Sequence, residues 1–396
     1  VVLPITFLIS SLGMAIGIGG SSIISRALGA KDKEKAYRTF GNQIMMTLVL
    51  ALIFVVIGFL FSDEILLLFG ANGDIMKPAK EFFIPVLIGV PFLALCMMGN
   101  NVIRAEGKAK FAMMAMIIPA FGNIILDIIF IKFLDMGMFG AALATTISYF
   151  MCFVFILWFF IKKSELKPSL HHYKFDLSIV KEISSLGLVT FSRQGVVSIL
   201  AIIINHTLFT YGGEHSVVVY GIISRMLMFA LFPILGITHG FLPIAGYNYG
   251  AENYNRVKET ISISIKYAAV LATFIFIGIL IFAKPIVSVF TNDVDVIAET
   301  PDALRWVFAA TPIIALQLIG AAYFQAAGKA IPALLLTLSK QGFFLIPLVL
   351  ILPNYFGIFG VWVAFPIADI LSTIITAYFL RREMTTKLIE KPDGIL

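Results

Sequence analysis

A single carboxylate, Asp127, interrupts an otherwise apolar stretch of the sequence. Asn123 lies four residues earlier and therefore on the same face of a helix. Thr145 and Thr146 lie in the next apolar stretch, so their hydroxyls can reach the same region. Carboxylate, amide and hydroxyl oxygens suit a sodium ion, and the carboxylate alone could carry a proton. The alternative is a structural Asp127 whose hydrogen bonds lock two helices together.

Four more charged residues lie deep in apolar stretches of the second half: Arg193, Arg225, Lys340 and Asp369. At about 1.5 Å per residue, each is roughly 14 to 18 Å from the nearest end of its stretch. Three cations accompany one anion, so we predict that Asp369 pairs with Lys340 or with one of the arginines. A structural ion-pair network and a substrate site both fit this cluster.

The elements that position these residues follow from composition. The 396 residues are 60% apolar and 13% charged, whereas soluble domains are roughly 45 to 50% apolar and about 25% charged. Apolar stretches of about 20 residues recur along the chain, and each can cross the bilayer as a helix. We expect an all-α, polytopic membrane protein in the lipid bilayer. The net charge of +6 lies in short loops, so no nucleic-acid partner is expected.

Eleven spans are predicted from charge and turn breaks. They lie near 2–28, 39–62, 76–104, 109–132, 137–161, 184–211, 215–243, 258–283, 299–326, 330–352 and 357–380.

Lysine and arginine gather in alternate loops, and the positive-inside rule places those loops in the cytoplasm. They include the long polar linker between the halves and the C-terminus with Lys391. His171 and His172 in the linker could form a metal pair, but we favour a solvated linker face.

An internal repeat relates the two halves. Leu28–Asp32 aligns with Tyr249–Asn253, and Gly107–Ala109 aligns with Gly328–Ala330 at the same offset in residue number. Repeats of six spans each would then leave the first half without its opening helix. We therefore expect a protein that is one helix longer, and that residues 1–396 alone would not transport. Parallel repeats around a central site are a known transporter architecture.

Two other interpretations fit less well. Ala15–Ser22 (AIGIGGSS) resembles a phosphate-binding loop, but no strand precedes it and no Gly-Lys-Ser/Thr follows, so close helix packing is favoured. An intramembrane enzyme would need paired catalytic carboxylates, a His-Glu metal motif or a serine nucleophile constellation, and the sequence offers none of them.

The sequence resembles the multidrug and toxic compound extrusion (MATE) family, and its bacterial MepA-like branch most. The resemblance rests on the repeat, Arg26–Ala30, Gly246–Ala251 and Trp362–Asp369 (WVAFPIAD). It covers the chain from the second of the family's twelve helices.

The resemblance implies two six-helix lobes in a V-shaped fold, with eleven helices in this chain. Residues 1–165 would form the N-terminal lobe, 166–183 the cytoplasmic linker and 184–396 the C-terminal lobe. It also implies a multidrug antiporter, not an enzyme, in the bacterial inner membrane. Amphipathic or cationic drugs would leave in exchange for Na⁺ or H⁺ by alternating access, which confers antibiotic resistance. No cofactor is expected beyond the coupling ion, and we expect a monomer.

The resemblance also implies site residues. The family's first-lobe cation site uses an Asn and an Asp four apart on the fifth helix, a hydroxyl on the sixth and an Asp on the first. Asn123, Asp127 and Thr145 match by spacing, while the first-helix Asp has no position here. A second-lobe Glu used by another branch has no counterpart, because Ser185–Tyr211 contains no acid.

A lipid-linked oligosaccharide flippase of the same superfamily is the alternative. Arg193, Arg225 and Lys340 would favour it if they face a cavity and hold a pyrophosphate.

Overall fold

The computed structural model describes residues 3–389, which form helices and short connections with no strand among them. Contacts divide the chain into two compact units, Val1–Phe191 and Ser192–Leu396. Ten helices in the described part are long and apolar enough to cross a membrane. Val2, at the start of the first predicted span, and Lys391, in the predicted cytoplasmic tail, lie outside the described residues.

The longest helix, α7 (Leu177–Gly250), has 74 residues and a break at Gly213, where φ is 65° and ψ is −163°. An unbroken helix of this length would measure about 110 Å, far more than the roughly 30 Å of hydrocarbon. The break therefore separates two crossings, which correspond to the predicted spans 184–211 and 215–243. Counted this way, the ten apolar helices provide the eleven predicted spans.

The first unit is a bundle in which α4 packs against α1, α2, α5 and α6. Its helices are α1 (Leu3–Gly29), α2 (Lys33–Leu60), α3 (Ser62–Leu68), η1 (Gly73–Ile75), α4 (Met76–Ala105), α5 (Ala109–Asp127), η2 (Ile128–Phe133) and α6 (Gly137–Lys162).

Small residues let the helices of the first unit approach closely. A Cβ atom at Gly17 of α1 would lie 3.0 Å from the Cα atom of Met98 in α4, and one at Gly20 would collide with the Gln43 side chain of α2. The Gln43 amide donates to the carbonyl oxygens of Ile16 at 2.8 Å and Gly17 at 3.2 Å. The glycine-rich stretch in α1 is thus a helix-packing surface, as predicted.

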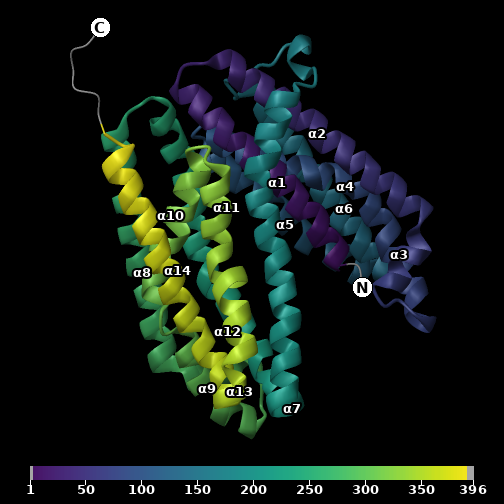
Figure 1. The fold of residues 1–396 in the computed structure, drawn as a ribbon. Helices are drawn as coiled ribbons and strands as arrows, with labels where there is room; N and C mark the ends of the chain where they lie inside the picture. Colours follow the sequence, from purple (N-terminus) through teal and green to yellow (C-terminus); the bar gives the residue numbers. More distant parts are fainter. Residues whose placement is uncertain (1–2, 390–396) are drawn as a thin grey trace. The chain divides into compact units, whose positions relative to one another are not determined.

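In the second unit, α10 packs against α8, α11 and α14 (Figure 1). Besides most of α7, it contains α8 (Tyr254–Phe290), α9 (Val294–Phe308), η4 (Thr311–Ile313), α10 (Ile314–Ala326), α11 (Ala330–Leu338), η5 (Ser339–Leu345), α12 (Ile346–Ile351), α13 (Pro353–Phe356) and α14 (Ile358–Thr386).

The helix boundaries confirm the internal repeat. Five helix boundaries in the first half have a counterpart in the second half at the offset of the sequence repeat. Two are helix ends, Gly29 with Gly250 and Ala105 with Ala326. Three are helix starts, Lys33 with Tyr254, Ala109 with Ala330 and Gly137 with Ile358. The caps repeat as well: the side chain of Asp32 accepts from the Lys35 amide at 2.9 Å, and that of Asn253 accepts from the Arg256 amide at 3.2 Å. Each cap satisfies a backbone donor at the start of its helix.

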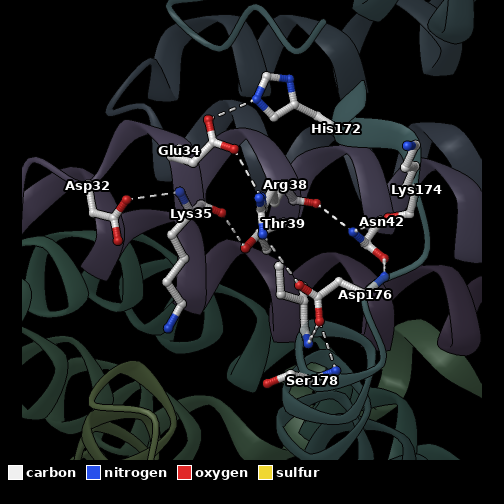
Figure 2. A network of polar contacts seen from close by, with 11 residues as sticks. Asp32, Glu34, Lys35, Arg38, Thr39, Asn42, His172, Lys174, Asp176 and Ser178 are labelled. Carbon is white, nitrogen blue, oxygen red and sulfur yellow. Dashed lines mark hydrogen bonds and ion pairs between the residues drawn. The ribbon is translucent and has the colours of Figure 1, made fainter. Parts of the chain in front are cut away.

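The linker is fixed along the first unit. Asn42 of α2 donates to the Lys174 carbonyl at 3.2 Å and accepts from the Asp176 amide at 2.9 Å (Figure 2). Near the start of the linker, Glu106 accepts hydrogen bonds from the Ser164 hydroxyl and the Glu165 amide. Burial raises the pKa of the Glu106 carboxyl. The predicted lobe boundaries at residues 165 and 184 stay predictions.

We predict that Gly213→Ala destabilises the protein by about 1 to 3 kcal/mol, because its backbone lies in a region that is essentially limited to glycine. Gly221→Ala is the control, since Gly221 is in the same helix and a Cβ atom there meets open space. Thermal unfolding of the two variants in detergent measures the difference. Equal midpoints would show that the break does not need glycine.

Candidate functional site

Asp127 is the last residue of α5, and the helix continues as the π-helical segment η2. Such wider turns occur frequently at functional sites. Among the described residues, Asp127 makes no hydrogen bond or ion pair, and its side chain is only partly exposed. A carboxylate without a partner at this depth of an apolar helix is costly and is therefore a candidate functional group.

Asn123 and Thr145 supply the other oxygen atoms that the sequence predicted. The Nδ2 atom of Asn123 is buried and has no hydrogen-bond partner in the described part of the chain. Because amide oxygen and nitrogen are assigned from such partners, an amide turned over would place Oδ1 at this buried position. The Thr145 hydroxyl donates to the Ala141 carbonyl at 2.9 Å, so its oxygen keeps acceptor capacity.

Two contacts set how α6 runs along α5. The Cys152 thiol of α6 donates to the Ala115 carbonyl of α5 at 3.1 Å. Nearer the start of α6, a Cβ atom added at Gly140 would lie 3.1 Å from the Cβ atom of Phe130 in η2, the segment that continues α5. Thr145 lies between these contacts, two helical turns before Cys152 and on the same face. This register brings Thr145 level with residues 123–127. No hydrogen bond joins Asn123, Asp127 and Thr145 within residues 3–389, so their grouping into one site stays a prediction.

Thr146 points to a different helix. Its hydroxyl donates to the Pro85 carbonyl of α4 at 2.8 Å. A Cβ atom at Gly89 would lie 3.2 Å from the Thr146 hydroxyl oxygen, which places this threonine in the contact between α4 and α6. The two neighbouring threonines thus have separate surroundings. Thr146 faces α4, whereas Thr145 lies on the face of α6 that contacts α5 through Cys152.

The structure confirms that Asp369 pairs with Lys340. The Lys340 Nζ atom in η5 lies 2.6 Å from the Asp369 Oδ1 atom in α14, and the side chains are 14% and 4% exposed. This oxygen has no aligned hydrogen-bond partner among the described residues, so the contact is held by charge. Arg193 is partly buried and Arg225 is exposed, and neither forms an ion pair with a described residue. The structure thus shows one ion pair from the predicted cluster, and the membership of the two arginines stays a prediction.

Sequence reasoning missed another buried ion pair. Lys329 pairs with Glu383, whose side chain is 12% exposed and also accepts from the Tyr323 hydroxyl at 3.3 Å. The repeat gave no signal for it, because the offset places Lys162 opposite Glu383. Lys108, which is equivalent to Lys329, pairs instead with Glu165 at 3.6 Å. These pairs tie loops to neighbouring helices and leave Asp127 as the unpaired acid of α5.

Comparison with known proteins agrees with the resemblance seen in the sequence. The MatE family model matches residues 1–129 and 193–351. Multidrug export protein MepA of Staphylococcus haemolyticus strain JCSC1435 is 29% identical over 387 residues, which are 97% of this chain and 85% of that protein. MepA of Staphylococcus aureus strain MSSA476 is 28% identical over 396 residues, 99% of this chain and 87% of that protein.

Solved structures give the same agreement. The MATE multidrug transporter DinF-BH aligns with a TM-score of 0.88 and 39% identity, over 98% of this chain and 87% of that one. An outward-facing multidrug resistance MATE family transporter aligns with a TM-score of 0.91 and 28% identity, over 97% and 86% of the two chains.

We predict that Asp369→Ala lowers the stability of the protein by about 3 to 5 kcal/mol, because it strands the Lys340 charge in a buried position. The double variant Lys340→Met/Asp369→Leu removes both charges and recovers most of the loss. Unfolding in detergent measures both, with Asp127→Asn as a control that strands no cation. A double variant as unstable as Asp369→Ala would show that the loss of stability does not come from the unpaired charge of Lys340.

Proposed function

The chain belongs to the multidrug and toxic compound extrusion (MATE) family, and from that premise we propose that it exports amphipathic or cationic drugs in exchange for Na⁺ or H⁺. The export proteins among its relatives support the substrate class. The observation that carries the coupling proposal is Asp127, a carboxylate in an apolar helix without an ionic partner among the described residues. The protein would act in the bacterial cytoplasmic membrane.

The proposed role of Asp127 follows from the cost of charge in hydrocarbon. A carboxylate without a partner there is neutralised by a proton or by a bound cation. When the ion leaves, the carboxylate becomes a negative charge that favours a cationic drug or a conformation with better solvation. Ion binding and drug binding are thereby linked through one charge, which is the requirement for exchange transport.

The residues beside Asp127 are compatible with either coupling ion. A sodium ion would take oxygen ligands from the Asp127 carboxylate, the Asn123 amide and the Thr145 hydroxyl, which retains acceptor capacity. A proton would need only the carboxylate. In both cases Asn123 and Thr145 orient or solvate Asp127, and alternating access would expose it to each side of the membrane in turn.

The flippase alternative has less support. It requires the positive charges of Arg193, Arg225 and Lys340 to be available to a pyrophosphate. Because Asp369 lies 2.6 Å from Lys340, one of these charges is already neutralised. The two arginines that remain carry no ion pair in the described part of the chain, and an anionic substrate remains an outcome that transport assays would reveal.

The orientation we propose places the linker and the C-terminal end of α14 in the cytoplasm. The loops and helix ends on that side contain most of the basic residues, including Lys33 and Lys35 in the first turn of α2 and Lys387 directly after α14. The positive-inside rule favours this orientation.

We predict that Asp127→Asn abolishes coupled drug export while expression and folding stay near those of the unchanged protein, because the amide keeps the shape and removes the charge. The measurement is efflux of a fluorescent cationic dye from cells with imposed sodium or proton gradients.

Asp135→Asn is the matched control. Asp135 lies eight residues along the chain in an exposed turn, and its φ of 51° is tolerated by asparagine. Dye efflux by Asp127→Asn at the rate of the control would refute the coupling role. Loss of expression in Asp127→Asn alone would instead indicate the structural role considered from the sequence.

A further inference from the structure

A cluster of metal-ligand side chains lies where the linker meets α2, away from the transport residues. Glu34 comes from the first turn of α2, and His171 and His172 come from the short helix η3 (Leu170–Tyr173). One ligand atom from each residue lies within 4.8 Å of the others. Nothing in the sequence alone places Glu34 beside a histidine pair so far along the chain.

His172 is held in place before any ligand arrives. Its side chain is 4% exposed, and the Tyr37 ring packs against it edge-on at a centroid distance of 5.4 Å. Its Nδ1 atom lies 2.8 Å from the Ser169 amide nitrogen and 3.2 Å from the Ser169 carbonyl oxygen. The prediction of a solvated linker face is therefore wrong for His172, because the η3 turn buries this ring against α2. The prediction holds for His171, which is exposed.

The Glu34 carboxylate is also oriented. Its Oε1 atom accepts from the Arg38 Nε atom at 2.9 Å, which leaves Oε2 to face His172 Nε2 at 3.0 Å (Figure 2). Asp176 lies 3.8 Å from the Arg38 guanidinium and offsets part of its positive charge. Partners of this kind, which orient a ligand through its other atom, are typical of metal sites.

The spacing suits a tetrahedral ion. Bonds of about 2.0 to 2.1 Å to zinc place neighbouring ligand atoms roughly 3.4 Å apart. The His172–Glu34 contact at 3.0 Å is already close to that separation. The exposed side chains of Glu34 and His171 can rotate to close the remaining distances, while the buried ring stays fixed. The His171 ring already lies against His172, with centroids 3.7 Å apart and the ring planes tilted by 38°.

Metal binding through His172 requires its ring proton to change places. At present the Ser169 amide donates to His172 Nδ1, so Nε2 carries the proton of the neutral ring and donates to Glu34. To bind a metal through Nε2, the neutral ring would move this proton to Nδ1. The new Nδ1–H group would then donate to the Ser169 carbonyl oxygen, which lies 3.2 Å away. The Ser169 amide would lose Nδ1 as its acceptor and would have to turn toward water instead.

We propose that Glu34, His171 and His172 form a binding site for a divalent transition metal, of which Zn²⁺ is the best match, with water in the fourth position. Two imidazole nitrogens and one carboxylate oxygen are the donor types that zinc binds. The bound metal fastens the linker to the first turn of α2. This metal-dependent contact between the linker and α2 adds to the hydrogen bonds that Asn42 already makes with Lys174 and Asp176.

The experiment is calorimetric titration of ZnCl₂ into the detergent-purified protein after removal of any polyhistidine tag. We expect one equivalent to bind, and His171→Ala and Glu34→Gln to weaken binding by at least about tenfold. His171 is the key position, because it is exposed and its loss leaves the buried His172 contacts in place. His215→Ala is the matched control, since it removes a second histidine–glutamate pair, His215–Glu299 at 3.1 Å, outside the cluster.

Limited trypsin digestion provides a second measurement. Zinc should slow cleavage after Lys174 of the linker in the unchanged protein and in His215→Ala, but not in His171→Ala. The proposal is overturned if the unchanged protein binds no equivalent of zinc, if His171→Ala binds as tightly as the unchanged protein, or if His215→Ala loses the bound equivalent. None of these results depends on drug export.

Discussion

Hydrocarbon offers no hydrogen-bond partner to a charged group, so a charge in a spanning helix is costly unless it is paired within the protein, neutralised by an ion or open to water. Lys340 and Asp369 meet this constraint by pairing, deep in the second unit. Asp127 does not, because no described residue offers it a cation or a donor. The contrast between the paired and the unpaired carboxylate is the physical basis of the transport proposal.

The same constraint accounts for the backbone near these charges. Asp127 adjoins the π-helical segment η2, and Lys340 lies within the π-helical segment η5. Wider turns shift the hydrogen-bond register and turn a side chain toward a new direction without ending the helix. The two halves share helix boundaries at one constant offset but carry different charges, so the repeat supplies the scaffold while the chemistry of each half is its own.

Much of the fold could be predicted from the sequence because hydropathy and the positions of small residues and caps act locally. The eleven spans, the repeat and the packing role of the AIGIGGSS stretch follow from such patterns. Charge balance predicted that Asp369 pairs with Lys340 or with an arginine, and the structure identifies Lys340 as the partner. The π-helical segments could not be predicted, since no side-chain pattern records a change of hydrogen-bond register. The hydrogen bond from Thr146 to Pro85 and the burial of His172 depend on tertiary contacts between segments distant in the chain.

In the proposed mechanism, dye movement is driven by exchange with a cation that binds Asp127. The most direct measurement is dye transport by the purified protein in liposomes, with a sodium or a proton gradient imposed in turn and the membrane potential clamped. The account predicts transport that follows at least one of the two gradients and reverses when that gradient is reversed. Dye transport of equal rate with both gradients abolished would contradict it.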